Sequence, residues 1–75
     1  MARLSEFEIG QSGRVVSVAG HDSVGRRLLE MGLTRGCPVT LVGTAPLGDP
    51  LELEVRGYRL SVRRSEAARV EVESA

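Results

Sequence analysis

The stretch LELEVRGYRLSVRR, residues 51–64, is the most regular part of the chain and predicts a β-hairpin. Apolar and polar residues alternate on both sides of Arg56-Gly57, which is typical of strands that bury one face. A two-residue loop at Arg56-Gly57 gives a register that pairs Val55 with Tyr58, Glu54 with Arg59, Leu53 with Leu60 and Glu52 with Ser61. The charged face is interpreted as solvated surface with complementary charges, and the rim of a partner site is the alternative.

The rest of the chain predicts further short strands around one helix. Residues 14–20, 38–42 and 69–73 are apolar or β-branched segments bounded by turn residues, as strands are. Residues 21–33 predict the helix, because Asp22 or Ser23 can cap its first amides and Gly32 suits the left-handed position that ends it. The Ser5–Glu8 spacing predicts a capping box and one more helical turn.

These elements together predict a mainly β fold, a small barrel or sandwich of about five strands with one short helix inserted after the first strand. The apolar residues of the strands should converge on one core. The predicted core contains Val15, Val16, Val18, Val39, Leu41, Leu51, Leu53, Val55, Leu60, Val62, Val70 and Val72.

Length and composition predict a single domain, residues 1–75, in the cytoplasm. A chain of 75 residues is the size of one small domain. Cys37 is the sole cysteine, so no internal disulfide can form, which fits a reducing compartment. No apolar run approaches the roughly 20 residues that span a bilayer, and the acidic N-terminal segment is unlike a secretory signal.

The charge balance and the scarcity of aromatic residues argue against nucleic acid as a ligand. Ten arginines are balanced by ten acidic residues, whereas nucleic-acid-binding domains usually carry a basic excess. Phe7 and Tyr58 are the only aromatic residues, too few for the stacking platforms that bind single strands. They are also too few for an aromatic groove that recognises proline-rich peptides.

The sequence predicts no metal site, no cofactor and no catalytic residue. His21, Met31 and Cys37 are not spaced as metal ligands usually are. A nucleophile needs a base that is held by a third group, and the single histidine has no evident orienting partner. Phosphate-binding glycine loops are also absent. Cys37 is expected to be a partly buried small hydrophobic residue. We therefore expect a binding domain and not an enzyme.

Two leucines stand out as apolar residues that the core does not require. On a helix, Leu29 lies about 140° from Val24, off the apolar stripe. Leu47 stands in the middle of the loop APLGDP. Leu29 either widens the buried stripe or stays exposed, and Leu47 either folds under its loop or stays exposed. If they are exposed, one or both help to form a partner-binding surface. The candidate partner-binding residues are Leu29, Pro46, Leu47 and Asp49.

The order of several short motifs resembles the ferrous iron transport protein A (FeoA) family. Residues 27–36 fit the family's run R-L-x-x-[ML]-G-[LI]-x-x-G. Residues 46–50 fit its P-x-G-x-P loop, and an alternating strand then leads to Gly57. Residues 60–67 fit its closing pattern L-x-[LVI]-R-x-x-[ED]-A. The resemblance extends from Leu4 to Val72.

This resemblance implies an SH3-like β-barrel and a small cytoplasmic accessory protein of ferrous iron uptake. Its partner would be the cytoplasmic part of the membrane iron permease, ferrous iron transport protein B (FeoB), which it would modulate. The same fold forms a domain of metal-dependent transcriptional repressors. The alternatives are therefore an SH3-like regulatory module of such a repressor, or a small nucleic-acid-binding barrel. The lack of a separate DNA-binding helix pair favours the accessory protein. Self-association into a homo-oligomer is left open.

Overall fold

The computed structural model describes residues 2–74, in which six strands form one antiparallel sheet with the order β1-β6-β2-β3-β4-β5. The strands are β1 (Ala2–Arg3), β2 (Ser12–Val18), β3 (Pro38–Thr44), β4 (Leu51–Val55), β5 (Tyr58–Val62) and β6 (Val70–Ser74). The helices are a 3-10 turn η1 (Leu4–Glu6), α1 (Ser23–Glu30) and α2 (Arg64–Ala67). The predicted mainly β fold is confirmed, and the predicted span of 1–75 includes Met1 and Ala75, which lie outside the described residues.

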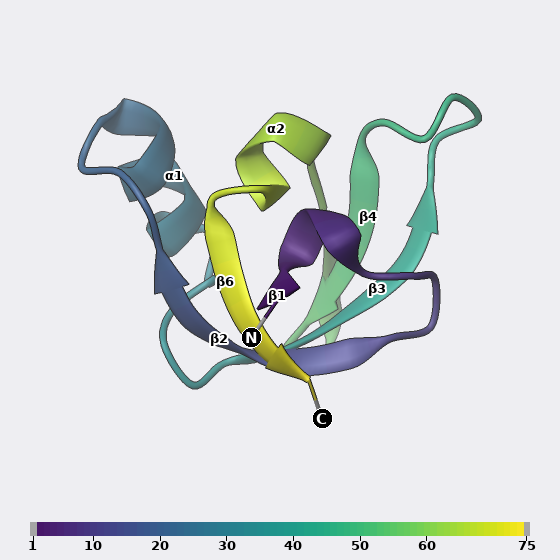
Figure 1. Cartoon of the computed structure of the whole chain (residues 1–75), viewed down its shortest axis with the longest axis horizontal. Coiled ribbons are helices and arrows are strands. Elements are labelled where there is room, and N and C mark those ends of the chain that lie inside the picture. The colour runs from purple at the N-terminus through teal and green to yellow at the C-terminus, as the bar shows by residue number, and fades with distance from the viewer. Residues whose placement is uncertain (1, 75) are drawn as a thin grey trace.

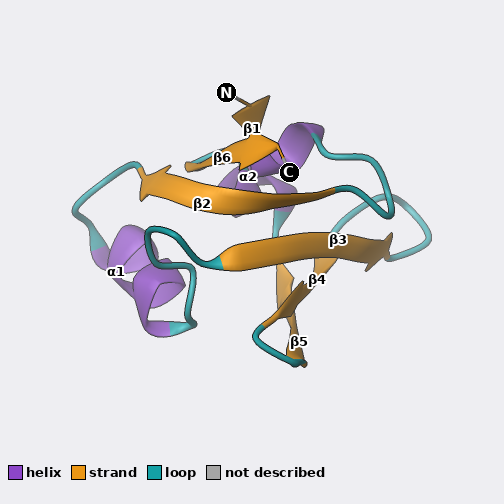
Figure 2. Ribbon diagram, turned by 90° about the horizontal axis from the view of Figure 1, so that it is seen from below, coloured by secondary structure: helices purple, strands orange, loops and turns teal. Residues whose placement is uncertain are grey.

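The sheet is strongly curved and leaves β1 and β5 as its two edges (Figures 1 and 2). Helices α1 and α2 and the loop between β3 and β4 line one rim of the curved sheet, with α2 in the middle (Figure 1). Because no described strand joins β5 to β1, the barrel is open on that side.

The hairpin has the predicted register. Val55 faces Tyr58, Leu53 faces Leu60, and the pairing continues to Leu51 and Val62. Arg56 and Gly57 have φ angles of 51° and 86°, as a two-residue type I′ turn requires. The apolar side chains of β4 are fully buried, which explains why the register is fixed: a slip of one residue would expose all of them.

Helix α1 begins and ends as the sequence predicts. The Asp22 carboxylate accepts a hydrogen bond of 3.0 Å from the backbone N–H of Gly25. At the other end Gly32 has a φ of 107°, and the Leu33 N–H donates to the Leu28 carbonyl at 3.2 Å. This is the Schellman arrangement, and the accompanying leucines are both fully buried.

The predicted capping box at Ser5 and Glu8 is wrong. The turn η1 begins earlier, at Leu4, and the Glu6 carboxylate accepts from the N–H of Arg3 at 2.9 Å. Leu4 is fully buried in the core. Its burial fixes the position of the turn, whereas the spacing of the polar residues does not fix it.

One buried cluster forms the core, as predicted, with one exception. The cluster contains Leu4, Phe7, Val15, Leu28, Leu33, Cys37, Val39, Leu41, Leu51, Leu53, Val55, Val62, Ala67, Val70 and Val72. Val18 and Leu60 are partly buried and pack against it. Val16 is wrongly predicted as core, because the pairing of β2 with β6 shifts between Val15 and Ser17 and breaks the alternation there.

Candidate partner-binding surface

The loop that joins β3 to β4, residues 45–50, displays an apolar residue on a closed frame. The N–H of Gly48 donates to the Ala45 carbonyl at 2.8 Å, and the Ala45 N–H donates to the Pro50 carbonyl at 3.1 Å. Leu47 at the tip is 96% exposed, and Pro46 beside it is also exposed. Leu47 therefore does not fold under its loop, and it is available to a partner.

Arg64 fastens this loop to the helix α2. Its guanidinium donates to the Gly48 carbonyl through Nε at 3.2 Å and Nη2 at 2.9 Å. A third donor, Nη1, reaches the Ser5 carbonyl at 2.9 Å. The Arg64 backbone N–H donates to the Asp49 carboxylate at 3.0 Å, so Asp49 satisfies the first free amide of α2. The base of the loop is thus held to two other elements while its tip stays exposed.

Leu29 lies on α1 and is 45% exposed, so it does not widen the buried stripe. It borders a hollow of about 210 Å³ with Gly20, His21 and Arg26. Helix α1 and the loop 45–50 lie at opposite ends of the molecule in both views (Figures 1 and 2). Leu29 and Leu47 therefore lie in two separate places on the surface and do not form one continuous apolar patch.

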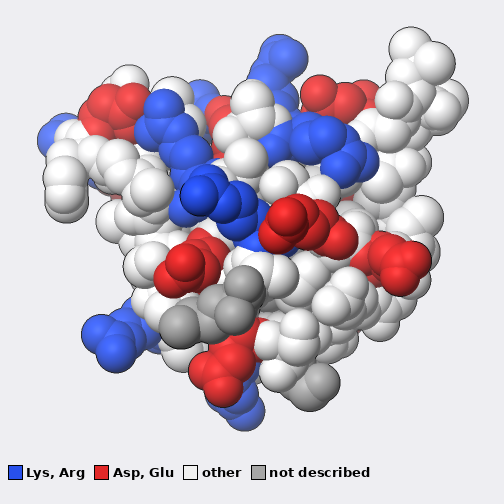
Figure 3. All heavy atoms as spheres, in the orientation of Figure 1, with Lys and Arg blue, Asp and Glu red and all other residues white. Residues whose placement is uncertain are grey.

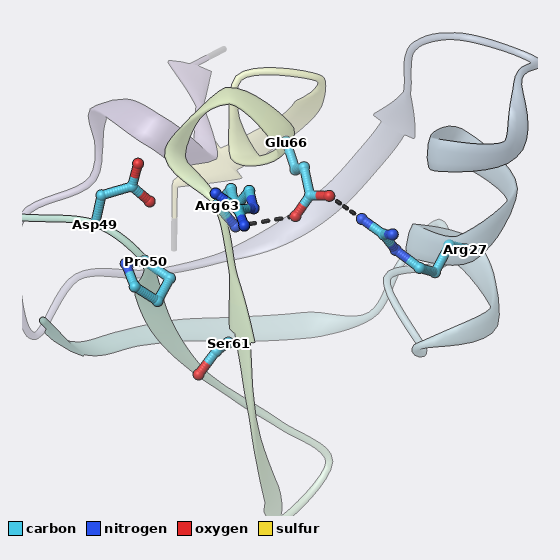
Figure 4. Close-up of a pocket in the computed structure, with 6 residues that line it drawn as sticks. All are labelled: Arg27, Asp49, Pro50, Ser61, Arg63 and Glu66. Carbon is cyan, nitrogen blue, oxygen red and sulfur yellow. Dashed lines mark hydrogen bonds and ion pairs between the residues drawn. The ribbon is translucent and has the colours of Figure 1, made fainter.

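A polar hollow of about 370 Å³ lies between α1 and the loop 45–50 (Figure 4). Its lining residues are Arg27, Asp49, Pro50, Ser61, Arg63 and Glu66. Arg27 of α1 and Glu66 of α2 form an ion pair beside it, and the other oxygen of Glu66 accepts from the Arg63 N–H at 2.9 Å. Since both oxygens of Glu66 are engaged, this carboxylate acts as a clamp between the helices.

A second ion pair joins the start of α1 to the segment before β6. The Arg69 guanidinium lies 2.7 Å from the Asp22 carboxylate. Hydrogen bonds from Arg69 and from the Gly25 N–H lower the pKa of Asp22 to about 2. Acidic and basic groups interleave over the face seen in Figure 3, so that face carries no extended basic area for a polyanion.

Sequence reasoning missed two other exposed apolar residues. Ile9 is 65% exposed and Tyr58 is 46% exposed. The Tyr58 hydroxyl donates to the Met31 carbonyl at 2.7 Å, which holds its ring against the end of α1. Nothing in the sequence pattern marks Ile9, whereas Tyr58 stands on the apolar face of the predicted hairpin but not in the predicted core.

Ionisable side chains that bind metals are dispersed over residues 2–74. No three His, Cys, Asp or Glu side chains gather there closely enough to share a metal ion. Cys37 was expected to be partly buried and is almost completely buried, and its Sγ donates to the Pro38 carbonyl at 3.4 Å. Among the same residues, no helix is long and apolar enough to cross a membrane.

The family model described as the FeoA domain matches residues 2–74. The chain belongs to the FeoA domain family. It is 42% identical over 71 residues to the Fe(2+) transport protein A/Fe(2+) transporter FeoB fusion protein of Porphyromonas gingivalis. That match covers 95% of this FeoA domain and 8% of the fusion protein, so the chain spans a small part of the length of that relative.

Solved FeoA structures have the same fold. The FeoA protein of Chlorobium tepidum is 42% identical, with a TM-score of 0.88, over 96% of this chain and 69% of the other. Stenotrophomonas maltophilia FeoA, solved with zinc and described as a procaryotic SH3 domain protein, is 38% identical, with a TM-score of 0.84. That match covers 97% of this chain and 91% of the other. The predicted SH3-like fold is thus confirmed, with the barrel open beside β5.

Proposed function

We propose that this FeoA domain, residues 1–75, is a cytoplasmic accessory domain of ferrous iron uptake that binds the cytoplasmic part of the permease FeoB and modulates it. The observation that carries the proposal is the fusion protein of Porphyromonas gingivalis, whose name joins Fe(2+) transport protein A to the transporter FeoB. A covalent link holds two modules at high local concentration, which favours even a weak contact between them. In a separate chain the same contact needs a docking surface.

The proposed docking surface consists of Leu47 and Pro46 on the loop 45–50 and Leu29 on α1. A few desolvated apolar side chains usually carry most of the energy of an interface, and a polar rim surrounds them. Leu47 suits this role because its loop is already fixed by Arg64, so little conformational entropy is lost when a partner covers it. Asp49 supports this surface through its hydrogen bond to the first amide of α2. The proposal assigns no catalytic residue, cofactor or bound metal to the domain.

The test is a titration of the isolated cytoplasmic part of the cognate permease with this domain. Leu47→Asp should weaken the association by about tenfold or more, because a desolvated leucine contributes a few kcal/mol to an interface. The matched control is Ile9→Asp, which makes the same change at an apolar residue that is also exposed but lies on another loop. Equal losses for the two variants would remove the loop 45–50 from the docking surface, and no binding by the wild-type domain would overturn the proposal.

A further inference from the structure

Strand β5 has one free hydrogen-bonding edge. Val55 and Tyr58, which flank the two-residue turn, form a hydrogen-bonded pair. Hydrogen-bonded and non-hydrogen-bonded pairs then alternate along the hairpin, so Arg59 and Ser61 belong to non-hydrogen-bonded pairs. The N–H and C=O groups of Arg59 and Ser61 therefore point away from β4. Within residues 2–74 no hydrogen bond reaches these groups outside the hairpin. An exposed strand with unpaired backbone groups is a template for another strand.

The free edge of β5 lies beside the polar hollow. In Figure 2 the hairpin of β4 and β5 lies lowest, with α1 beside it. In the close-up, β5 runs between Asp49 and Pro50 on one side and Arg27 on the other, with the polar hollow beside it (Figure 4). Ser61 on β5 and Arg27 on α1 both line this hollow of about 370 Å³, so the hollow adjoins the outer half of the strand.

We infer that β5 pairs antiparallel with β5 of a second copy of this chain, in a two-fold register centred on Leu60. In this register Arg59 faces Ser61 of the second copy, and Ser61 faces its Arg59. These are the residues whose backbone groups are free, so each facing pair exchanges hydrogen bonds in both directions. The inference concerns self-association and does not depend on the permease.

The inner face of the joined sheet is apolar throughout in this register. Leu60 meets Leu60 of the second copy, and each is backed by Leu53 of its own hairpin. In the neighbouring row Tyr58 faces Val62 of the second copy. Leu60 is only partly buried and Tyr58 is 46% exposed, so both gain cover that a single copy does not give them. Cross-strand apolar pairs of this kind stabilise a sheet.

The outer face has complementary charges in the same register. Arg59 lies between Glu54 of its own hairpin and, beyond the small Ser61, Glu52 of the second copy. Neighbouring strands lie about 4.8 Å apart, so an arginine side chain can reach across one strand. The row therefore alternates acid, base, small polar residue and acid, with no facing like charges.

The neighbouring registers that use the same backbone groups place arginines against each other. A pairing centred on Arg59 makes Arg59 face Arg59 of the second copy. A pairing centred on Ser61 makes Arg59 face Arg63 of the second copy. Like charges directly opposite one another destabilise a sheet. If the strand added to β5 belongs to a second copy, the charge pattern thus favours the register centred on Leu60.

Disulfide trapping tests the register directly. Residues that face each other in a non-hydrogen-bonded antiparallel pair have Cα atoms about 4.5 Å apart, within the range that a disulfide accepts. On mild oxidation Leu60→Cys should give a covalent dimer, while Arg59→Cys and Ser61→Cys, as matched controls, should not. The native Cys37 is buried and stays unchanged in all three chains. Equal trapping at all three positions would indicate random collision and overturn the inference.

The edge itself is tested by sedimentation equilibrium of Ser61→Pro and Ser61→Ala. Proline removes the outward N–H of residue 61 without removing a bond to β4, and edge strands tolerate it there. It should raise the dimer dissociation constant by about tenfold or more, since one hydrogen bond is lost from each copy. Ser61→Ala keeps the N–H and should behave as wild type.

Two outcomes of these measurements overturn the inference. The first is a wild-type domain that stays monomeric at the highest soluble concentration. The second is a Ser61→Pro variant that self-associates normally while circular dichroism shows a native fold. Such a variant can also bind the permease's cytoplasmic part more weakly. In that case the edge receives a strand of the permease and not a second copy. Failure of Leu47→Asp to affect permease binding leaves these results unchanged, so the two proposals are tested separately.

Discussion

Gly25 is a residue whose role depends on one close approach. It lies in the first turn of α1, and a Cβ at this position would be 2.4 Å from the Gly20 carbonyl oxygen. In an exposed helix a change from glycine to alanine usually stabilises by up to about 1 kcal/mol. Here we expect Gly25→Ala to lower the free energy of unfolding by roughly 1–3 kcal/mol, because the helix must move away from the preceding loop.

Urea denaturation measures this change, with Glu30→Ala on the exposed side of the same helix as its control. That variant should lie within about 0.5 kcal/mol of wild type, as surface substitutions usually do. A more stable Gly25→Ala domain would show that the loop yields easily.

Asp22 makes the stability of the domain depend on pH. Its pKa is lowered to about 2 by the hydrogen bonds from Arg69 and the Gly25 N–H, below the value of about 3.9 expected in the unfolded chain. A group with a lowered folded pKa stabilises the fold above its unfolded pKa, and this contribution is lost as the pH falls through the folded pKa. We therefore expect Asp22→Asn to melt at a lower temperature than wild type at pH 7.

The difference in melting temperature should shrink between about pH 4 and pH 2, where wild-type Asp22 itself becomes protonated. Asparagine is also a good N-cap, so this substitution removes the charge and keeps the cap. Melting curves of the wild-type and Asp22→Asn domains between pH 7 and pH 2 measure how this difference depends on pH. A difference that stays constant with pH would assign the effect to packing.

At the residue scale, local contacts could be predicted and distant ones could not. Asp22 and Gly32 were identified because their partners lie within a few residues along the chain. Arg64 was not, since its side chain bonds to the carbonyls of Gly48 and Ser5, which only the finished fold brings near it. Ser5 was itself assigned to a cap that does not form, because polar spacing alone does not show where Leu4 is buried.

The hairpin is the element on which the fold depends most clearly. Leu53 stands in the middle of β4, and its side chain is 0% exposed to solvent. Leu53→Ala should lower the free energy of unfolding by roughly 2–5 kcal/mol, because it leaves a cavity in the core. Glu52→Ala, one residue away on the solvated face, is the matched control and should have little effect. Chemical denaturation of both variants gives the answer, and equal values would contradict the burial of one face.

Elements differ in how far the sequence specifies them. The register of β4 and β5 was predicted in full, because both strands and their turn lie within residues 51–62. The pairing of β2 with β6 joins opposite ends of the chain, so the shift after Val15 left no signal in either strand and Val16 was misplaced. The two-residue strand β1 was missed because so short a segment shows no alternation.

For the whole molecule, the separation of Leu29 and Leu47 limits how a partner can bind. The sequence marked both residues but not their positions, because these follow from where α1 and the loop 45–50 lie on the curved sheet (Figure 1). The domain measures 30 Å along its longest axis. One interface of standard size can therefore cover both Leu29 and Leu47 only if the partner spans the rim from α1 to the loop 45–50.

A partner that covers both points makes their contributions independent, since sites more than about 7–10 Å apart usually add. We expect Leu29→Gln to raise the dissociation constant for the permease's cytoplasmic part. In the double variant with Leu47→Asp, the dissociation constant should rise by the product of the two increases seen in the single variants. Calorimetric titration of the four chains measures these factors. Because the contacts are apolar, the affinity should change little with salt, whereas binding to a polyanion falls steeply. A Leu29→Gln domain that binds as wild type would confine docking to the loop 45–50, and one that unfolds would place Leu29 in the core.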